Sequence, residues 1–176
     1  MTDRREFRPL QAEEIARAFS DEGVDYLFIG KSAAILLGYP STTQDVDIFP
    51  ARTPENGKRI VTALRKIGFE IGGELERDIV GGKDFVQIKT GPFDVDLVFA
   101  PDGIESFSEA RTRRVTEGIF LVANLRDIIA SKRASGRQKD KIELSMLENF
   151  LVEYEKRHAP PLQSAGDIVK KKMRDK

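Results

Sequence analysis

The sequence predicts an α/β (α+β) fold: a mixed, mainly antiparallel sheet with carboxylates on one face, helices packed behind it, and a helical pair at the C-terminal end. Short apolar or alternating segments typical of strands are interleaved with segments whose apolar residues recur at helical spacing. Aspartates occupy alternate positions in two strand-like segments, as expected where one face of a strand is exposed. Two helical segments follow the last short strand.

Periodicity sets the type of each expected element, and Gly, Pro or Asn residues mark the ends. Helices are expected over 11–19, 32–37 and 54–67, from Asn124, and over about 138–154, and strands over 26–29, 45–49, 69–71, 84–89, 93–99 and 118–122. Thr90-Gly91-Pro92 predicts a tight turn that pairs the strands on either side of it as a hairpin. Ser135-Gly136 divides the last two helices.

Length and composition predict one soluble domain. The chain has 176 residues, 40% of them hydrophobic and 33% charged, which allows one sizeable core but not two. We expect this domain over 1–158, with its core over about 20–123, C-terminal helices over about 124–156, and a polar Lys-rich tail over 159–176. No segment approaches the roughly 20 apolar residues that span a bilayer, and the start lacks an export signal, so we expect a cytoplasmic protein without a membrane partner.

Residue types restrict the chemistry. Cysteine is absent and His158 is the single histidine, so sulfur-based zinc sites and thiolate catalysis are excluded and carboxylates must hold any metal. The 29 basic and 29 acidic residues balance, so any nucleic-acid contact must be local. Two local basic clusters fit either RNA phosphates or solvated surface charge, and they comprise Arg111, Arg113 and Arg114, and Lys132, Arg133, Arg137, Lys139 and Lys141.

Two aspartates on one predicted strand form the most informative feature. Asp45 and Asp47 share a face of the strand, while Val46 and Ile48 point into the core. Adjacent carboxylates repel each other unless a cation lies between them, and hard oxygen ligands suit Mg²⁺ or Mn²⁺. An isolated pair of this kind more often simply faces water.

A second strand repeats the arrangement and favours the metal interpretation. Asp94 and Asp96 again alternate with apolar residues, and Asp96 lies deeper in the apolar run, before Leu97. A third carboxylate beside Asp45 and Asp47 would complete a two-metal site. Asp96 is therefore the expected third ligand, although the roles of Asp94 and Asp96 could be exchanged.

These motifs resemble the DNA polymerase β-type nucleotidyltransferase superfamily over about residues 20–100. The shared pattern is a glycine-small-residue turn, a short helix, a D-x-D strand, and a later aspartate on a neighbouring strand. The residues that carry the likeness are Gly30, Ser32, Thr43, Asp45, Asp47 and Asp96.

The resemblance implies roles for these residues. Gly30 and Ser32, with Thr43, would bind the nucleotide triphosphate, the D-x-D pair would hold two Mg²⁺ ions, with Mn²⁺ as a substitute, and Asp96 would hold one ion and help to deprotonate the acceptor hydroxyl. Many minimal members have a second glycine where this chain has Lys31. Either the turn differs here or Lys31 itself reaches a phosphate.

The second half of the chain extends the resemblance. Lys132, followed by Arg137-Gln138-Lys139-Asp140 and Glu143, is similar to the K…R-x-K-D-x-x-D run of AbiEii-like (abortive infection) nucleotidyltransferases, with Glu143 in place of the usual aspartate. Lys132 falls on the apolar face of its helix, where a cation should have an anionic partner, and nucleotide phosphate is the functional candidate. Alternatively, the side chain extends along the apolar surface to water and has no such partner. Lys139 is expected either to bind nucleotide or to form a helix ion pair with Glu143.

The resemblance implies an enzyme that transfers a nucleoside monophosphate from an NTP to an acceptor hydroxyl. tRNA or a protein would be the acceptor, in a toxin–antitoxin or phage-defence setting, with an antitoxin as a candidate partner. Two alternatives are a small-molecule (antibiotic-type) nucleotidyltransferase and a non-catalytic binding or antitoxin module of the same fold. An acidic pocket for a small molecule could come from Glu74, Glu76 and Asp78. The apolar stripe on the last helix predicts core or a face for homo-oligomers, and it comprises Leu147, Phe150, Leu151 and Tyr154.

Overall fold

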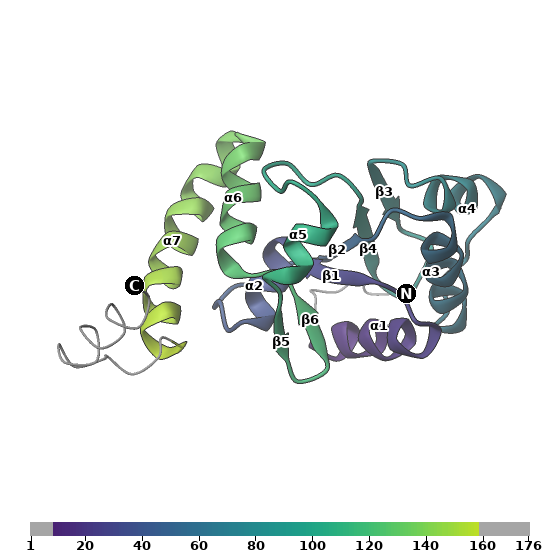
Figure 1. Ribbon diagram of the computed structural model, residues 1–176, viewed down its shortest axis with the longest axis horizontal. Coiled ribbons are helices and arrows are strands. Elements are labelled where there is room, and N and C mark those ends of the chain that lie inside the picture. The colour runs from purple at the N-terminus through teal and green to yellow at the C-terminus, as the bar shows by residue number, and fades with distance from the viewer. Residues whose placement is uncertain (1–8, 159–176) are drawn as a thin grey trace, which may run out of the picture.

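A six-stranded mixed sheet forms the centre of the computed structural model, which describes residues 9–158 (Figure 1). Residues 1–8 and the tail predicted over 159–176 lie outside the described residues. The strands are β1 (Tyr26–Ile29), β2 (Asp45–Pro50), β3 (Phe85–Ile88), β4 (Asp94–Val98), β5 (Val115–Glu117) and β6 (Phe120–Val122). The helices are α1 (Pro9–Glu22), α2 (Gly30–Leu36), α3 (Pro54–Lys66), α4 (Gly73–Val80), α5 (Phe107–Thr112), α6 (Leu125–Ser135) and α7 (Gln138–His158).

The sheet has the order β3-β4-β2-β1-β6-β5. Three neighbouring pairs run antiparallel, whereas β2 with β4 and β1 with β6 run parallel. The predicted α/β class with a mixed, mainly antiparallel sheet is therefore confirmed, as is the hairpin of β3 and β4. Because β2 and β4 are parallel neighbours, their first residues lie at the same edge of the sheet.

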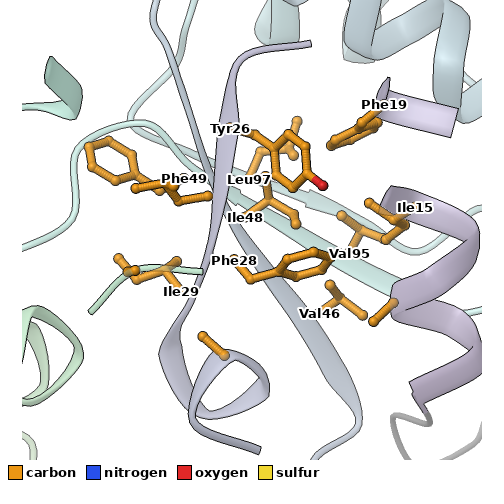
Figure 2. Close-up of a cluster of buried hydrophobic side chains, with 14 of the residues drawn as sticks. Ile15, Phe19, Tyr26, Phe28, Ile29, Val46, Ile48, Phe49, Val95 and Leu97 are labelled. Carbon is orange, nitrogen blue, oxygen red and sulfur yellow. The ribbon is translucent and has the colours of Figure 1, made fainter. Parts of the chain in front are cut away.

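Alternation along β2 and β4 separates the core from the opposite face of the sheet. Val46, Ile48, Val95 and Leu97 are fully buried, and Figure 2 shows them on the side where Ile15 of α1 packs. Each such side chain contributes about 1.5–3 kcal/mol through burial. This apolar layer fixes which way the intervening aspartates of both strands must point.

Local signals explain where the helices begin and end. Thr53 caps α3 by accepting a hydrogen bond from Asn56 N at 3.1 Å, and Pro54 follows in the first turn. Asn124 caps α6 by accepting from Arg126 N at 2.8 Å. Gly136, at φ 63°, ends α6 in the left-handed conformation that favours glycine, so the chain can turn back into α7.

The strand predicted over 69–71 is wrong. Phe69 and Ile71 are buried, yet they lie in a loop between α3 and α4. Phe69 packs edge-on against Phe93, with ring centroids 5.3 Å apart, and Glu70 N donates a single hydrogen bond to Thr90 O. The apolar alternation there reflects burial of a loop rather than a strand.

Helix α4, helix α5 and strand β5 were not expected from the sequence. The expected strand over 118–122 is a hairpin of β5 and β6, and Gly118, at φ 58°, lies between the two strands. Helix α5 begins after Ser106, whose hydroxyl accepts from Glu109 N at 3.2 Å. Helix α4 carries the acidic residues considered for a small-molecule pocket, and it lies at the far side of the molecule from α6 (Figure 1).

The predicted C-terminal helical pair is present, and α6 packs against α7 (Figure 1). Helix α7 continues to His158, four residues beyond the predicted end. Its apolar stripe faces inward, since Leu147 is fully buried and Phe150 lies with its ring centroid 5.4 Å from that of Tyr39. The core interpretation of this stripe is therefore correct for the single chain.

Candidate active site

Parallel pairing brings the aspartates of β2 and β4 together. In the register of the two strands, Asp45 lies beside Asp94 and Asp47 beside Asp96. Asp45 and Asp47 are partly exposed, whereas Asp96 is only 7% exposed. Asp96 is thus the more deeply buried aspartate of β4, and its choice over Asp94 as third metal ligand stays a prediction.

The carboxylates are electrostatically unfavourable as they stand. Burial, followed by the charges of Asp96 and Asp45, raises the pKa of Asp47 to about 8, and Lys132 opposes this effect. Burial and the charge of Asp45 raise the pKa of Asp96 to about 6, while Lys89 opposes this effect. A cluster with these shifts lacks positive charge, which a proton or a bound cation can supply.

Gly30 allows the turn after β1 to approach Asp47. Its φ of 70° lies in the region that favours glycine, and a Cβ atom at this position would lie 2.4 Å from Asp47 Oδ2. No side chain other than hydrogen fits there without displacing the carboxylate. This glycine is therefore required by both the backbone conformation and the adjacent aspartate.

Ser32 ties the same turn to β2. Its hydroxyl is completely buried, donates to Ile29 O at 3.2 Å and accepts from Asp47 N at 3.1 Å. The hydroxyl therefore already fixes the backbone of Asp47 relative to the turn. Thr43 has a related position, since its hydroxyl accepts from Asp45 N at 3.5 Å.

Lys132 of α6 lies close enough to the carboxylates to lower the pKa of Asp47. Its ammonium group also lies 3.6 Å from Asp140 Oδ1, and its side chain is only 18% exposed. Asp140 in turn accepts a hydrogen bond from Ser135 Oγ at 2.9 Å. In this structure the anion that contacts Lys132 is therefore the Asp140 carboxylate of α7.

Lys31 forms a second contact with α7. Its ammonium nitrogen lies 3.6 Å from Glu143 Oε1. Glu143 thus pairs with Lys31, and the helix ion pair considered for Lys139 and Glu143 is not formed among the described residues. Lys139 is exposed and makes no ion pair with any other described residue. Positions 31 and 143, where the sequence departs from the pattern it resembles, therefore contact each other.

A buried tyrosine completes this contact. Tyr39 is 3% exposed, and its pKa is raised to about 12 by burial and by the neighbouring Glu143 carboxylate. Tyr39 Oη and Glu143 Oε1 are both buried, and neither has a hydrogen-bond partner of normal geometry within residues 9–158. The two groups thus approach each other without forming a good hydrogen bond.

Sequence reasoning missed Lys89 as a neighbour of the carboxylates. It follows β3, and its charge lowers the pKa of Asp96. The available signal was its place in the hairpin, where extending the register of β3 and β4 by one residue puts it opposite Asp94. The sequence also assigned Tyr39 no role at the site, because its contact with Glu143 has no local signal.

The donor set fits a hard cation. Asp45, Asp47 and Asp96 offer only carboxylate oxygens, which Mg²⁺ and Mn²⁺ prefer. Within residues 9–158, no three Asp, Glu or His side chains already surround a single metal position. The interaction of the Asp47 and Asp96 carboxyl groups raises the pKa of Asp47 further, which shows that the two groups lie close together.

Several other predicted features lie apart from the carboxylates. Arg113 is paired with Glu105 at 2.6 Å and with Asp127 at 3.0 Å, so it is not free for RNA phosphates. On α4, Glu76 pairs with Arg65 at 3.2 Å. A hollow of about 300 Å³ lies at the opposite ends of β2 and β4, and its lining includes Phe49, Phe99, Ile104 and Phe107.

Comparison with known proteins supports the fold. No protein-family model matches the sequence, and no curated protein matches it. A candidate nucleotidyltransferase from Thermotoga maritima, solved as a crystal structure, matches with a TM-score of 0.51 at 16% identity, over 82% of this chain and 92% of that chain. The protein therefore shares the fold of that structure. Among residues 9–158, no helix is long and apolar enough to cross a membrane.

Proposed function

We propose that the protein is a Mg²⁺-dependent nucleotidyltransferase that moves a nucleoside monophosphate from an NTP to an acceptor hydroxyl. The observation that carries this proposal is the convergence of Asp45, Asp47 and Asp96 beside the Gly30 turn. The raised pKa values of Asp47 and Asp96 mean that their charged forms are unfavourable in the metal-free protein, and a bound cation would remove this penalty. The shared fold with a candidate nucleotidyltransferase agrees with this interpretation.

The cation site would be formed by Asp45, Asp47 and Asp96. Two Mg²⁺ ions bound there would neutralise the triphosphate and polarise the reacting oxygens. The absence of a side chain at Gly30 lets the turn lie directly against Asp47, and the Ser32 hydroxyl holds the backbone N–H of Asp47 in place. These residues would fix the position of the nucleotide relative to the acceptor.

In the reaction, the acceptor oxygen attacks the α-phosphorus and forms the new phosphoester bond, while the bond from the α-phosphorus to the bridging oxygen breaks and pyrophosphate leaves. Asp96, which is only 7% exposed and lies beside Asp47 in the sheet, takes the proton of the acceptor hydroxyl. Lys132 stabilises the negative charge that develops on the phosphates.

The proposal also covers the class of molecule that accepts the nucleotide. The resemblance of the Lys132 to Glu143 region to AbiEii-like enzymes favours tRNA or a protein in a toxin-like or phage-defence setting. For a small-molecule acceptor, the acidic residues of α4 offer no support, since Glu76 and Asp78 are engaged with Arg65 and Lys83.

Label transfer tests this function. The protein is incubated with Mg²⁺ and each NTP labelled at the α-phosphate, together with total tRNA or a protein extract, and products are separated by size. Label from the α-phosphate but not from the γ-phosphate should enter one acceptor class, and Asp96→Asn should abolish the transfer. Labelling from the γ-phosphate, or equal labelling by Asp96→Asn, would contradict nucleotidyl transfer by this site.

A further inference from the structure

Lys31, in the turn that contacts Asp47, extends its side chain to α7. Lys31 directly follows Gly30, whose backbone contacts Asp47, so its side chain starts next to the proposed triphosphate site. In the structure its ammonium group is directed to Glu143 of α7, 3.6 Å away. The exposed fractions of the two side chains, 29% and 20%, show that this contact is partly shielded from water.

The contact is poorly optimised. At 3.6 Å it is an ion pair but longer than a normal hydrogen bond. Glu143 Oε1 is buried and lacks a hydrogen bond, and Tyr39 Oη beside it also lacks one. At 3.6 Å the ammonium group of Lys31 makes no hydrogen bond to Glu143, so a phosphate oxygen that accepted one would offer Lys31 a stronger contact.

A second lysine is held in the same way. Lys132, which is near enough to Asp47 to affect its pKa, is paired with Asp140 of α7 at 3.6 Å. Asp140 and Glu143 both lie in the first two turns of α7. The beginning of this helix is therefore attached to the domain through the two lysines that a bound triphosphate would attract.

We propose that Lys31 and Glu143 form a latch that nucleotide opens: Glu143 and the phosphates of the NTP compete for the ammonium group of Lys31. The inference rests on the proposed function. A triphosphate carries more negative charge than one carboxylate, so Lys31 exchanges Glu143 for phosphate on binding. By thermodynamic linkage, the pairing of Lys31 with Glu143 weakens nucleotide binding, and nucleotide loosens the first turns of α7.

A double-mutant cycle measures this competition. The dissociation constant of the tightest-binding Mg·NTP is determined by calorimetry for wild type, Glu143→Gln, Lys31→Met and the double variant. Glu143→Gln should bind about fivefold more tightly than wild type, as expected for release of one partly exposed ion pair. The same change in the Lys31→Met background should leave the dissociation constant unaltered. Glu148→Gln is the matched control, because Glu148 lies on the same helix and pairs with Arg133 instead.

Amide hydrogen exchange of wild type provides a readout that needs no variant. Saturating Mg·NTP should increase exchange over 138–145, whereas nucleotide that ordered this segment would overturn the latch. Unchanged or weaker binding by Glu143→Gln, or equal tightening in the Lys31→Met background, would also overturn it. In each of these results wild type binds Mg·NTP, so the proposed function survives; absence of binding by folded wild type would overturn both.

Discussion

Replacing Asp47 by Asn should stabilise the metal-free protein at neutral pH. Because burial and two neighbouring carboxylates raise the pKa of Asp47 from 3.8 to about 8, the folded state is penalised once the unfolded chain has lost its proton. The stability contributed by the protonated group is complete below pH ~4 and is lost as the pH rises towards 8. Asparagine has nearly the same shape and does not ionise.

The expected size follows from the same shift. At about 1.36 kcal/mol per pH unit, raising the pKa from 3.8 to about 8 costs at most about 5–6 kcal/mol in free energy of unfolding. Asp47 keeps partial contact with solvent, which screens its charge, so we expect Asp47→Asn to gain about 2 kcal/mol at pH 8. At pH 4 the two proteins should be nearly equal.

Urea unfolding in EDTA at pH 4, 6 and 8 gives the required free energies. Wild type should also gain stability when Mg²⁺ is added at pH 8, and Asp47→Asn should not. Asp84→Asn is the matched control, because Asp84 is exposed and, within residues 9–158, its carboxylate pairs with Arg52 alone. If Asp47→Asn were less stable than wild type at pH 8, the carboxylates would not repel each other and the electrostatic reasoning would be refuted.

Three further substitutions test other parts of the account. Gly30→Ala should destabilise the fold by more than the ~1–2 kcal/mol cost of a left-handed residue, because its Cβ would lie 2.4 Å from Asp47 Oδ2. The substitution should also abolish NTP binding measured by calorimetry, and retained binding would show that the close contact of Gly30 with Asp47 is dispensable. Lys132→Met should weaken Mg·NTP binding about tenfold, as loss of a charge-assisted contact predicts, and unchanged affinity would remove Lys132 from the site. Asn56→Ala should cost about 2–4 kcal/mol in urea unfolding, since Asn56 is 3% exposed and joins Asp25 and Ala51 through three hydrogen bonds. Its NTP affinity should not change, and a loss of affinity in the folded variant would indicate a wider site.

Period-two alternation made the carboxylate face predictable. Val46 and Ile48 had to be buried, so Asp45 and Asp47 had to share the other face, and the same logic applied to Asp96. The sequence could not show that β2 and β4 are parallel neighbours in a register that puts Asp47 beside Asp96. That register depends on long-range packing of the sheet, which no local pattern records.

Other features were hidden for different reasons. Ser106 and Glu109 offered a capping signal for α5 that the sequence interpretation did not use. The strand expected over 69–71 was wrong because burial of a loop imitates a strand when Phe69 and Ile71 both point inward. The contact between Lys31 and Glu143 joins residues far apart in the chain, so only the packing of α7 reveals it.

The proposed function depends on Asp45, Asp47 and Asp96 holding Mg²⁺ together with an NTP. Calorimetric titration of each NTP with Mg²⁺ into wild type, the Asp45→Asn/Asp47→Asn variant and the Asp84→Asn control tests it without knowledge of the acceptor. Wild type should bind NTP with micromolar affinity in a manner that requires Mg²⁺, and this binding should be lost in Asp45→Asn/Asp47→Asn and kept in Asp84→Asn. Equal binding by wild type and the double variant, or none by well-folded wild type, would contradict it.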